Sequence, residues 1–403
     1  MRTRINCLAG DLNVVCVSND PGGGSAVLPV AREIGERGHN ICSYIAGPSV
    51  DIFRYKAPEL DYEAVDDNIL PVIAQSVLKK NGTSILVSAS GTYNKMEHTF
   101  RVAARALGIP IVAVCDYWYD YSASFGREET GGLVQSLPDI VCVPDEISRA
   151  EICKEIGIAP TNVVVTGPPA LEDSVCSFHS TSEMNRDKWL RKYDLGKGQT
   201  TLVFFSDAFY TGPNGAYEEA AEGRLFDDSG QSIFGYTPPE ILEVLVNVLL
   251  EESVKFDRKI NLLVKPHPRE HPEKLMPILD ALEDQLVTAK LLTNISAVEL
   301  MSVADVVFGM GSIVLIESAL NGKPTISVQI GLLGQDTFDP CMGNTLGYTI
   351  PVFDNAKLKL VISKILDGSI IDVVPKPDNP LLIDGAAARV ADVIESVQRT
   401  LES

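Results

Sequence analysis

Short apolar runs alternate along the chain with longer segments whose apolar residues recur at helical spacing. Runs such as residues 12–19 (LNVVCVSN) and 84–90 (SILVSAS) are bounded by turn residues and have the length of strands. Residues 25–37 and 97–108 instead show the pattern of amphipathic helices, and residues 97–108 end at a glycine. Repeated strand–helix alternation predicts a parallel sheet covered by helices on both faces.

The alternation stops at residues 170–198, which are polar and contain no strand pattern, and resumes at residues 200–207 (TTLVFFSD). We therefore expect an α/β protein of two doubly wound, Rossmann-like domains with an interdomain cleft. The expected divisions are an N-terminal domain at 1–175, a linker at 176–198, a C-terminal domain at 199–385 and a terminal helix at 386–403 that packs back on the N-terminal domain. A long glycine-rich, acidic stretch at residues 211–237 is typical of a functional or mobile loop.

Composition and net charge indicate which classes of partner the protein can bind. Of the 403 residues, 45% are apolar and 22% charged, which is ordinary for a soluble globular protein. The formal net charge of −20 argues against non-specific binding to nucleic acid or to anionic membrane, because both require basic surfaces. An anionic small molecule remains compatible with this charge, since a few basic side chains or one helix N-terminus can bind it.

Cysteine usage and the chain ends predict a cytoplasmic protein. The eight cysteines form no C-x-x-C pair, and several fall in apolar runs, as expected of buried reduced thiols. The first residues lack the apolar core of a signal peptide, and no stretch reaches the ~20 apolar residues of a membrane helix. Peripheral association with a membrane through a partner stays open, as does the oligomeric state.

Two glycine-rich turns could bind anions. Gly22, Gly23 and Gly24 lie between a strand and a helix, where an anion or a sugar could approach backbone amides. The dinucleotide fingerprint G-x-G-x-x-G fails there because Val27 replaces the third glycine, which disfavours NAD. The alternative is a tight turn without a ligand.

The second turn follows the apolar run DVVF. The amides at Gly311 and Ser312 open a predicted helix and suit a phosphate group. Glu317 lies further along that helix, where its carboxylate could accept hydrogen bonds from two ribose hydroxyls. The alternative for Glu317 is a solvated helix residue, although its neighbours are apolar and a buried carboxylate needs partners.

The segment HPREH (residues 267–271) allows two interpretations. It matches the zinc pattern H-x-x-E-H, but Pro268 and Pro272 disfavour the helix that such a site needs. The other interpretation is a basic turn at the end of the strand LLVKP, with Lys265, His267 and Arg269 facing a diphosphate. We prefer this second interpretation and expect no metal. A purely structural loop, with Arg269 paired to Glu270 in solvent, is the remaining alternative.

The motifs K-P-H-P-R and G-M-G-S-x-x-x-x-E-S-A-L-x-G-K-P, set in two doubly wound domains, resemble the GT-B superfamily. The chain is similar in layout to bacterial surface-polysaccharide glycosyltransferases and to hydrolysing UDP-N-acetylglucosamine 2-epimerases. This resemblance implies a nucleotide sugar held mostly by the C-terminal domain, with Gly311 and Ser312 at the diphosphate and Glu317 at the ribose. The chain departs from the epimerases, having AVCDYWYD for H-V-E-A-G and HPREH for H-R-x-E-N. It also departs from CDP-glycerol transferases, with GMGSI for T-D-Y-S-S.

Two aspartates are candidates for the catalytic base. Asp20 and Asp116 each follow a strand, at the edge where open α/β sheets bind ligands. Asp116 is preferred because Tyr117, Trp118 and Tyr119 follow it and aromatic rings suit sugar faces. The alternatives are a turn residue for Asp20 and a capping residue for Asp116.

The sequence thus predicts a GT-B glycosyltransferase of surface glycan or glycoconjugate assembly. Its donor would be a nucleotide diphospho-sugar, with a UDP-sugar as first choice, its acceptor a glycan or lipid-linked molecule, and no cofactor would be required. A hydrolysing 2-epimerase and a non-catalytic nucleotide-sugar-binding subunit are the alternatives. The nucleotide base, the sugar, the acceptor and the stereochemical outcome are not predicted.

Overall fold

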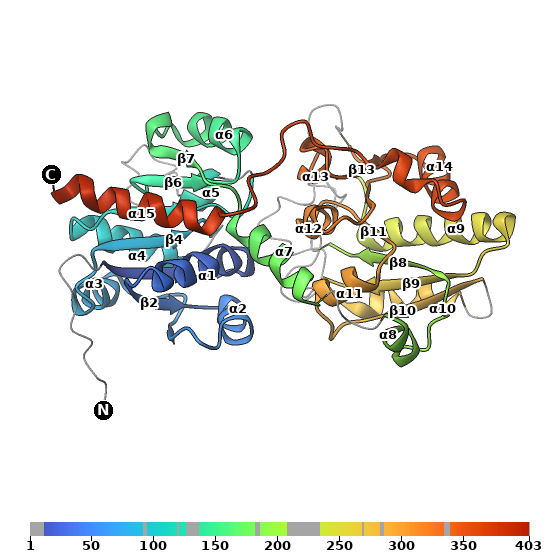
Figure 1. Cartoon of the computed structure of the whole chain (residues 1–403), viewed down its shortest axis with the longest axis horizontal. Helices are drawn as coiled ribbons and strands as arrows, with labels where there is room; N and C mark the ends of the chain where they lie inside the picture. Colours follow the sequence, from blue (N-terminus) through green and yellow to red (C-terminus); the bar gives the residue numbers. More distant parts are fainter. Residues whose placement is uncertain are drawn as a thin grey trace. The chain divides into compact units, whose positions relative to one another are not determined.

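The computed structural model describes residues 12–91, 95–118, 121–125, 137–181, 186–207, 234–267, 270–282, 286–333 and 339–402. The chain divides into two compact units, shown in Figure 1. The first comprises Met1–Asp173 together with Leu381–Ser403, and the second is Ser174–Pro380. Each unit is built on its own parallel sheet, as the alternating pattern predicts.

The sheet of the first unit has seven strands in the order β3-β2-β1-β4-β5-β6-β7. These are β1 (Asn13–Ser18), β2 (Asn40–Ile45), β3 (Tyr62–Ala64), β4 (Ile85–Ala89), β5 (Ile111–Val114), β6 (Ile140–Val143) and β7 (Val163–Val165). The helices are α1 (Pro21–Glu36), α2 (Ser49–Lys56), α3 (Pro71–Lys80), α4 (Lys95–Ala106), α5 (Tyr121–Phe125), α6 (Glu146–Ile156) and α15 (Ala386–Glu402), with a 3-10 turn η1 (Pro160–Asn162).

The middle of strand β1, VVCV, is apolar without interruption because both of its faces are buried. Successive side chains of a strand point to opposite faces. Val14 and Cys16 therefore pack in the core beneath α1, whereas Val15 and Val17 pack in the core on the other face, with Phe100 of α4. The C-terminal helix α15 contacts α1 and belongs to this unit, although it comes last in the chain (Figure 1).

The sheet of the second unit has six strands in the order β10-β9-β8-β11-β12-β13. They are β8 (Thr200–Phe205), β9 (Ile260–Lys265), β10 (Val287–Leu291), β11 (Val306–Gly309), β12 (Thr325–Val328) and β13 (Ile350–Val352). The helices of this part are α7 (Pro169–Thr181), which runs across the boundary between the units, α8 (Arg186–Lys192), α9 (Pro238–Phe256), α10 (Met276–Asp280), α11 (Ala297–Val303), α12 (Val314–Leu320), α13 (Met342–Thr345) and α14 (Asn355–Leu366), with 3-10 turns η4 (Pro272–Lys274) and η5 (Ile370–Val373).

Two helix starts differ from the sequence prediction. Helix α1 begins at Pro21 and not at residue 25, so the three glycines form its first turn. Proline suits this position because its missing N–H is not needed there, and Asp20 provides the N-cap. Helix α12 begins at Val314, two residues after the predicted start at Ser312. No helix in the described ranges is both long and apolar enough to cross a membrane.

Candidate functional site

In the first unit, polar side chains gather where β1, β4 and β5 end. The chain leaves β1 toward β2 on one side and returns to β4 on the other, so the topological switch point lies between β1 and β4. Ligands of open α/β sheets bind at such points. Asp20 follows β1, Ser90 follows β4 and Asp116 follows β5. The structure thus brings the two predicted catalytic aspartates to one edge of the sheet.

The glycine turn makes room for this pair. A Cβ atom at Gly22 would lie 2.0 Å from Oδ2 of Asp116 and 3.3 Å from Oδ1 of Asp20. The amide of Gly23 donates to Oδ1 of Asp20 at 2.7 Å, and the amide of Gly24 donates to its main-chain oxygen at 2.9 Å. Both amides therefore bind Asp20, and the absence of a side chain at Gly22 admits the carboxylate of Asp116.

The environment of Asp116 shifts its titration toward neutrality. Burial first, and the nearby charge of Asp20 second, raise the pKa of Asp116 to about 7. The hydroxyl of Ser90 donates to Oδ1 of Asp116 and partly opposes this rise in pKa. A carboxyl with a pKa near 7 can accept or release a proton at neutral pH, as a general base or acid must.

Glu97, which was not selected from the sequence, belongs to the same cluster. Glu97 lies on α4, is 0% exposed, and accepts the amide hydrogen of Asn19 through Oε1 at 2.7 Å. Burial, followed by the charge of Asp20, raises the pKa of Glu97 to about 7. A signal was available, because Glu97 and Arg101 alternate at helical spacing with the buried Met96 and Phe100.

Of the aromatic residues expected to suit a sugar face, Trp118 is buried. Trp118 is 2% exposed, and its Nε1 donates to Oδ2 of Asp145 at 2.7 Å. Its ring therefore packs inside the unit and cannot present a face to a sugar. Tyr117 is half-buried, and its ring meets that of Trp118 edge-on. Tyr119 lies outside the described residues.

In the second unit, His267 and Glu270 of the HPREH segment bind each other just after the end of β9. The main-chain oxygen of His267 accepts the amide hydrogen of Glu270 at 2.8 Å, and the carboxylate of Glu270 accepts the amide hydrogen of His267 at 3.3 Å. The backbone at His271 is extended (φ −86°, ψ 111°), so the two histidines do not share a helix. Among the described residues, no group of three or more His, Cys, Asp or Glu is arranged to hold a metal ion.

Among the predicted cations, Lys265 is held at the end of β9. Lys265 is the last residue of β9 and half-buried, its Nζ donates to the main-chain oxygen of Thr293 at 3.4 Å, and burial lowers its pKa. Arg269 lies outside the described residues. Glu270 is only 7% exposed, which corrects the alternative of an ion pair in solvent. Burial and the charge of Asp207 raise the pKa of Glu270 to about 7.

At the predicted phosphate turn, the amide of Gly311 donates to Oδ2 of Asp207 at 3.1 Å. Asp207 follows β8, was not selected from the sequence, and is 7% exposed. Ser312 is half-buried, and its Oγ lies 3.5 Å from the amide nitrogen of Val314. Glu317 is half-buried on α12, between Ile316 and Ser318, which are both fully covered. A carboxylate therefore already binds one of the amides assigned to phosphate.

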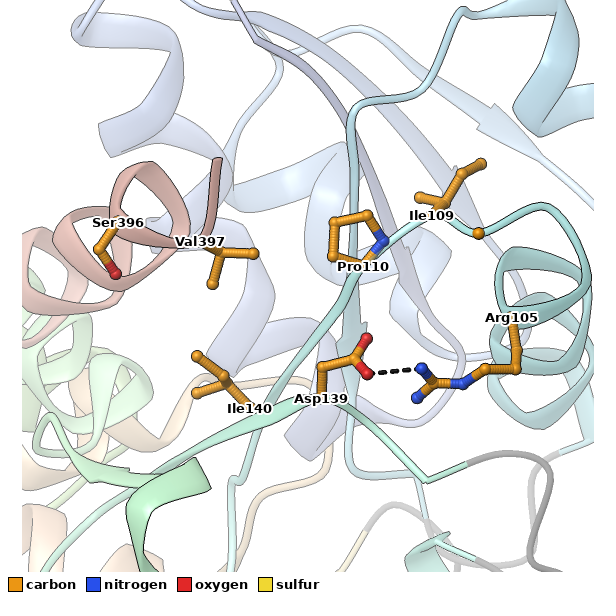
Figure 2. A pocket seen from close by; sticks show the side chains of 8 residues that line it. Arg105, Ile109, Pro110, Asp139, Ile140, Ser396 and Val397 are labelled. Atoms are coloured by element: carbon orange, nitrogen blue, oxygen red, sulfur yellow. Dashed lines mark hydrogen bonds and ion pairs between the residues drawn. The ribbon is translucent and has the colours of Figure 1, made fainter. Parts of the chain in front are cut away.

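Two cavities, one in each unit, lie away from these side chains. One of about 430 Å³ opens where β5 and β6 begin, and it contains the ion pair of Arg105 with Asp139 at 2.5 Å (Figure 2). Another of about 570 Å³ lies where β8 and β11 begin, beside Arg186 and Asp305. Ligands of α/β sheets bind at the carboxyl ends of strands, so we place the candidate site by its side chains and not by these cavities.

Comparison with known proteins places the fold. No protein-family model matches the sequence, and no curated protein matches it. Among solved structures, the UDP-GlcNAc 2-epimerase of Neisseria meningitidis bound to UDP-GlcNAc is 14% identical, with a TM-score of 0.66 over 95% of this chain and 99% of the other. The Methanocaldococcus jannaschii UDP-GlcNAc 2-epimerase in complex with UDP-GlcNAc and UDP is 13% identical, with a TM-score of 0.62 over 95% and 99%.

A glycosyltransferase of Rickettsia africae is also similar, at 12% identity and a TM-score of 0.61 over 96% of this chain and 98% of the other. At such identities the likeness defines the fold. The chain consists of two Rossmann-like α/β domains of the GT-B type, which confirms the fold class predicted from the sequence.

Proposed function

We propose that this protein is an enzyme that acts on a nucleoside diphosphate sugar of the UDP-GlcNAc type, and that its first candidate reaction is hydrolytic 2-epimerisation. Two observations support the proposal. Proteins described as UDP-GlcNAc 2-epimerases match 95% of this chain, and two of these structures hold UDP-GlcNAc. The pairing of Asp20 with Asp116 at the switch point supplies a group suited to proton transfer.

The carboxylate pair carries the proposal, because inversion at C2 of a sugar must break and re-form the C2–H bond. That step needs a base whose pKa lies close to the working pH. Asp116 meets this requirement, since burial and Asp20 raise its pKa to about 7. In this proposal Asp116 removes the C2 proton as the C1–O bond to UDP breaks, and water then adds at C1 while a proton returns to C2. Asp20 sets the proton affinity of Asp116.

We assign the nucleotide to the second unit. Lys265, His267 and Arg269 would stabilise the negative charge of the departing UDP, as donors and cations do for a developing anion. Gly311 and Ser312 would meet the diphosphate, and Glu317 the ribose. Since the amide of Gly311 donates to Asp207, that carboxylate must release the amide before a phosphate oxygen can accept it.

Glycosyl transfer is the second candidate reaction. It is favoured by the replacement of the epimerase segments H-V-E-A-G and H-R-x-E-N by AVCDYWYD and HPREH. In a transferase, Asp116 would accept the proton of the acceptor hydroxyl, and the same groups of the second unit would bind the leaving diphosphate. The donor site is thus common to both reactions. They differ in whether the C2–H bond is broken and in whether water or an acceptor hydroxyl adds to C1.

The two reactions can be separated by incubating the protein with UDP-GlcNAc in D₂O without an acceptor and following the mixture by ¹H NMR. Epimerisation predicts release of UDP together with deuterium at C2 of the freed N-acetylhexosamine. Transfer predicts UDP release only after a glycan acceptor is added, without deuterium at C2. Binding of UDP-GlcNAc without either reaction would support the non-catalytic subunit. Failure to bind UDP-GlcNAc at all would overturn the proposal.

A further inference from the structure

The turn that carries Asp20 is fixed by contacts from several elements. The main-chain oxygen of Asn19 accepts the amide hydrogen of Ser49 at 3.0 Å, and the main-chain oxygen of Asp20 accepts the Ser49 hydroxyl at 2.5 Å. The side-chain amide of Asn19 donates to Asp67. These contacts hold the carbonyl groups and the Asn19 side chain, and they leave the amide of Asn19 to another partner.

Glu97 is that partner. Its Oε1 accepts the amide hydrogen of Asn19 at 2.7 Å, and this contact joins α4 to the residue immediately before Asp20. Oε2 of Glu97 is buried, with no hydrogen-bond partner among the residues that the structure describes. Burying a carboxyl group is costly unless its contacts compensate. A fully buried glutamate next to the site is therefore expected to have a structural or catalytic role there.

Arg101, one helical turn further along α4, contacts the other side of the cluster. Its guanidinium is 1% exposed and donates to the main-chain oxygen of Ala89 at 3.2 Å and to Oγ of Ser88 at 2.9 Å. Both acceptors lie at the end of β4, next to Ser90, which donates to Asp116. Helix α4 thus reaches the turn of Asp20 through Glu97 and the strand end beside Asp116 through Arg101.

We propose that Glu97 is a positioning residue that holds the carboxylate of Asp20 beside Asp116 by binding the main-chain amide of Asn19. The expected effect on turnover rests on the proposed function, whereas the positioning itself does not. Within this cluster Glu97 faces the negative charge of Asp20 and the positive charge of Arg101. Burial and Asp20 favour its protonated form, so glutamine, a neutral side chain with the same carbonyl acceptor, is the conservative replacement.

Amide hydrogen exchange tests the positioning directly. In the Glu97→Met variant, which lacks an acceptor, we expect the amide of Asn19 to exchange at least tenfold faster relative to that of Val87 in β4. In Glu97→Gln, we expect a change below threefold. Glu252→Met is a matched control, because Glu252 is also buried but contacts Lys255 and Ser363 in the second unit. Unchanged exchange at Asn19 in Glu97→Met would overturn the inference.

If Glu97→Met does not fold, Glu97→Asp provides a second test, because the shorter side chain withdraws the acceptor while keeping a carboxyl group. Faster exchange at Asn19 is then expected, and exchange equal to that of the unchanged protein would overturn the inference. The comparison with Val87 separates local opening from general loss of stability.

Turnover of UDP-GlcNAc distinguishes positioning from catalysis by Glu97 itself. We expect Glu97→Met to lower kcat at least tenfold with the affinity for UDP unchanged, and Glu97→Gln to restore most of the rate. Loss of turnover in Glu97→Gln with normal exchange at Asn19 would show that Glu97 carries a proton and would overturn the positioning role. If the unchanged protein has no turnover, the proposed function fails, and the exchange result still decides the position of the turn.

Discussion

At the scale of single residues, the approach of Asp116 to Asp20 depends on a missing side chain. A Cβ atom on residue 22 would lie only 2.0 Å from Oδ2 of Asp116, and it would lie 3.3 Å from Oδ1 of Asp20. Burial disfavours the ionised form of Asp116 most, and the nearby charge of Asp20 adds to the effect. The raised pKa of Asp116 follows from this packing.

The first prediction concerns Gly22→Ala. The added methyl group must displace the carboxylate of Asp116, so we expect a loss of about 1–3 kcal/mol in the free energy of unfolding and at least a tenfold loss of turnover. Gly35→Ala in the same helix is the control, because the nearest atom to its Cβ would be 3.9 Å away. The free energy of unfolding of Gly35→Ala should rise by about 0.5–1 kcal/mol. Equal urea-unfolding curves for Gly22→Ala and the unchanged protein would contradict the account.

The second prediction is that Asp116→Asn abolishes proton transfer but leaves the nucleotide site intact. We expect kcat to fall at least about 100-fold, within the range that general acid–base catalysis supplies. The affinity for UDP, measured by calorimetry, should stay within threefold, since we assign UDP to the second unit. Wild-type turnover in this variant would remove Asp116 from the mechanism.

The third prediction uses the pH dependence of stability. The pKa of Asp116 and that of Glu97 are raised to about 7 in the folded state, above their unfolded values. Their stabilising contribution is complete below the unfolded pKa values and is lost as pH rises toward 7, with a slope of at most about 1.4 kcal/mol per pH unit for each group. The free energy of unfolding of the first unit should therefore fall between pH 5 and pH 7.

Asp20→Asn tests the cause of this pH dependence, because the charge of Asp20 contributes to both raised pKa values. Urea unfolding at pH 5, 6 and 7 should show a shallower decline in the variant than in the unchanged protein. Identical slopes would mean that Asp20 does not interact with the other two carboxyl groups.

At the scale of elements, the strands were predictable and some helix starts were not. Parallel strands covered on both faces appear in sequence as apolar runs, and β1, β9 and β11 contain the runs VVCV, LLV and VVF. The start of α1 was missed because three consecutive glycines have low helix propensity. The N-cap at Asp20 and the close packing of Gly23 on Ala89 and of Gly24 on Ser49 outweigh that preference.

The candidate site was predictable where it follows strand ends. Asp20 and Asp116 could be expected to meet because parallel strands end at one edge of a sheet. The helical spacing of Glu97 beside Met96 and Phe100 could indicate its burial, but only the fold shows that it binds the turn after β1. Asp207 and Glu270 likewise come together only through the pairing of β8 with β9, which the sequence does not specify.

The fourth prediction belongs to the turn after β11. If a phosphate oxygen binds the amide of Gly311, it competes with the carboxylate of Asp207. Asp207→Asn removes the negative charge at nearly constant size, and we expect UDP to bind about three- to tenfold more tightly by calorimetry. Asp305→Asn, which removes the same charge just before the start of β11, is the control and should leave the affinity for UDP unchanged. Weaker binding in Asp207→Asn would instead make Asp207 a nucleotide ligand.

At the scale of the whole molecule, the two units carry different parts of the proposed chemistry. The carboxylate pair lies in the first unit, and the residues assigned to the nucleotide lie in the second. The two-domain organisation could be predicted because the strand–helix alternation occurs twice, separated by a polar stretch. The reaction could not be predicted, because epimerisation and transfer share a donor site and differ in whether the C2–H bond is broken.

The measurement that tests the central claim most directly is a thermal-shift titration with UDP, GDP, CDP, ADP and NAD, beside Glu317→Ala and Asp116→Asn. A ligand at 100 times its Kd adds about 2.7 kcal/mol to the free energy of unfolding. We predict that UDP stabilises the unchanged protein and Asp116→Asn but not Glu317→Ala. Stabilisation by NAD alone, or by none of the five nucleotides, would contradict the assignment of a nucleotide-sugar site to the second unit.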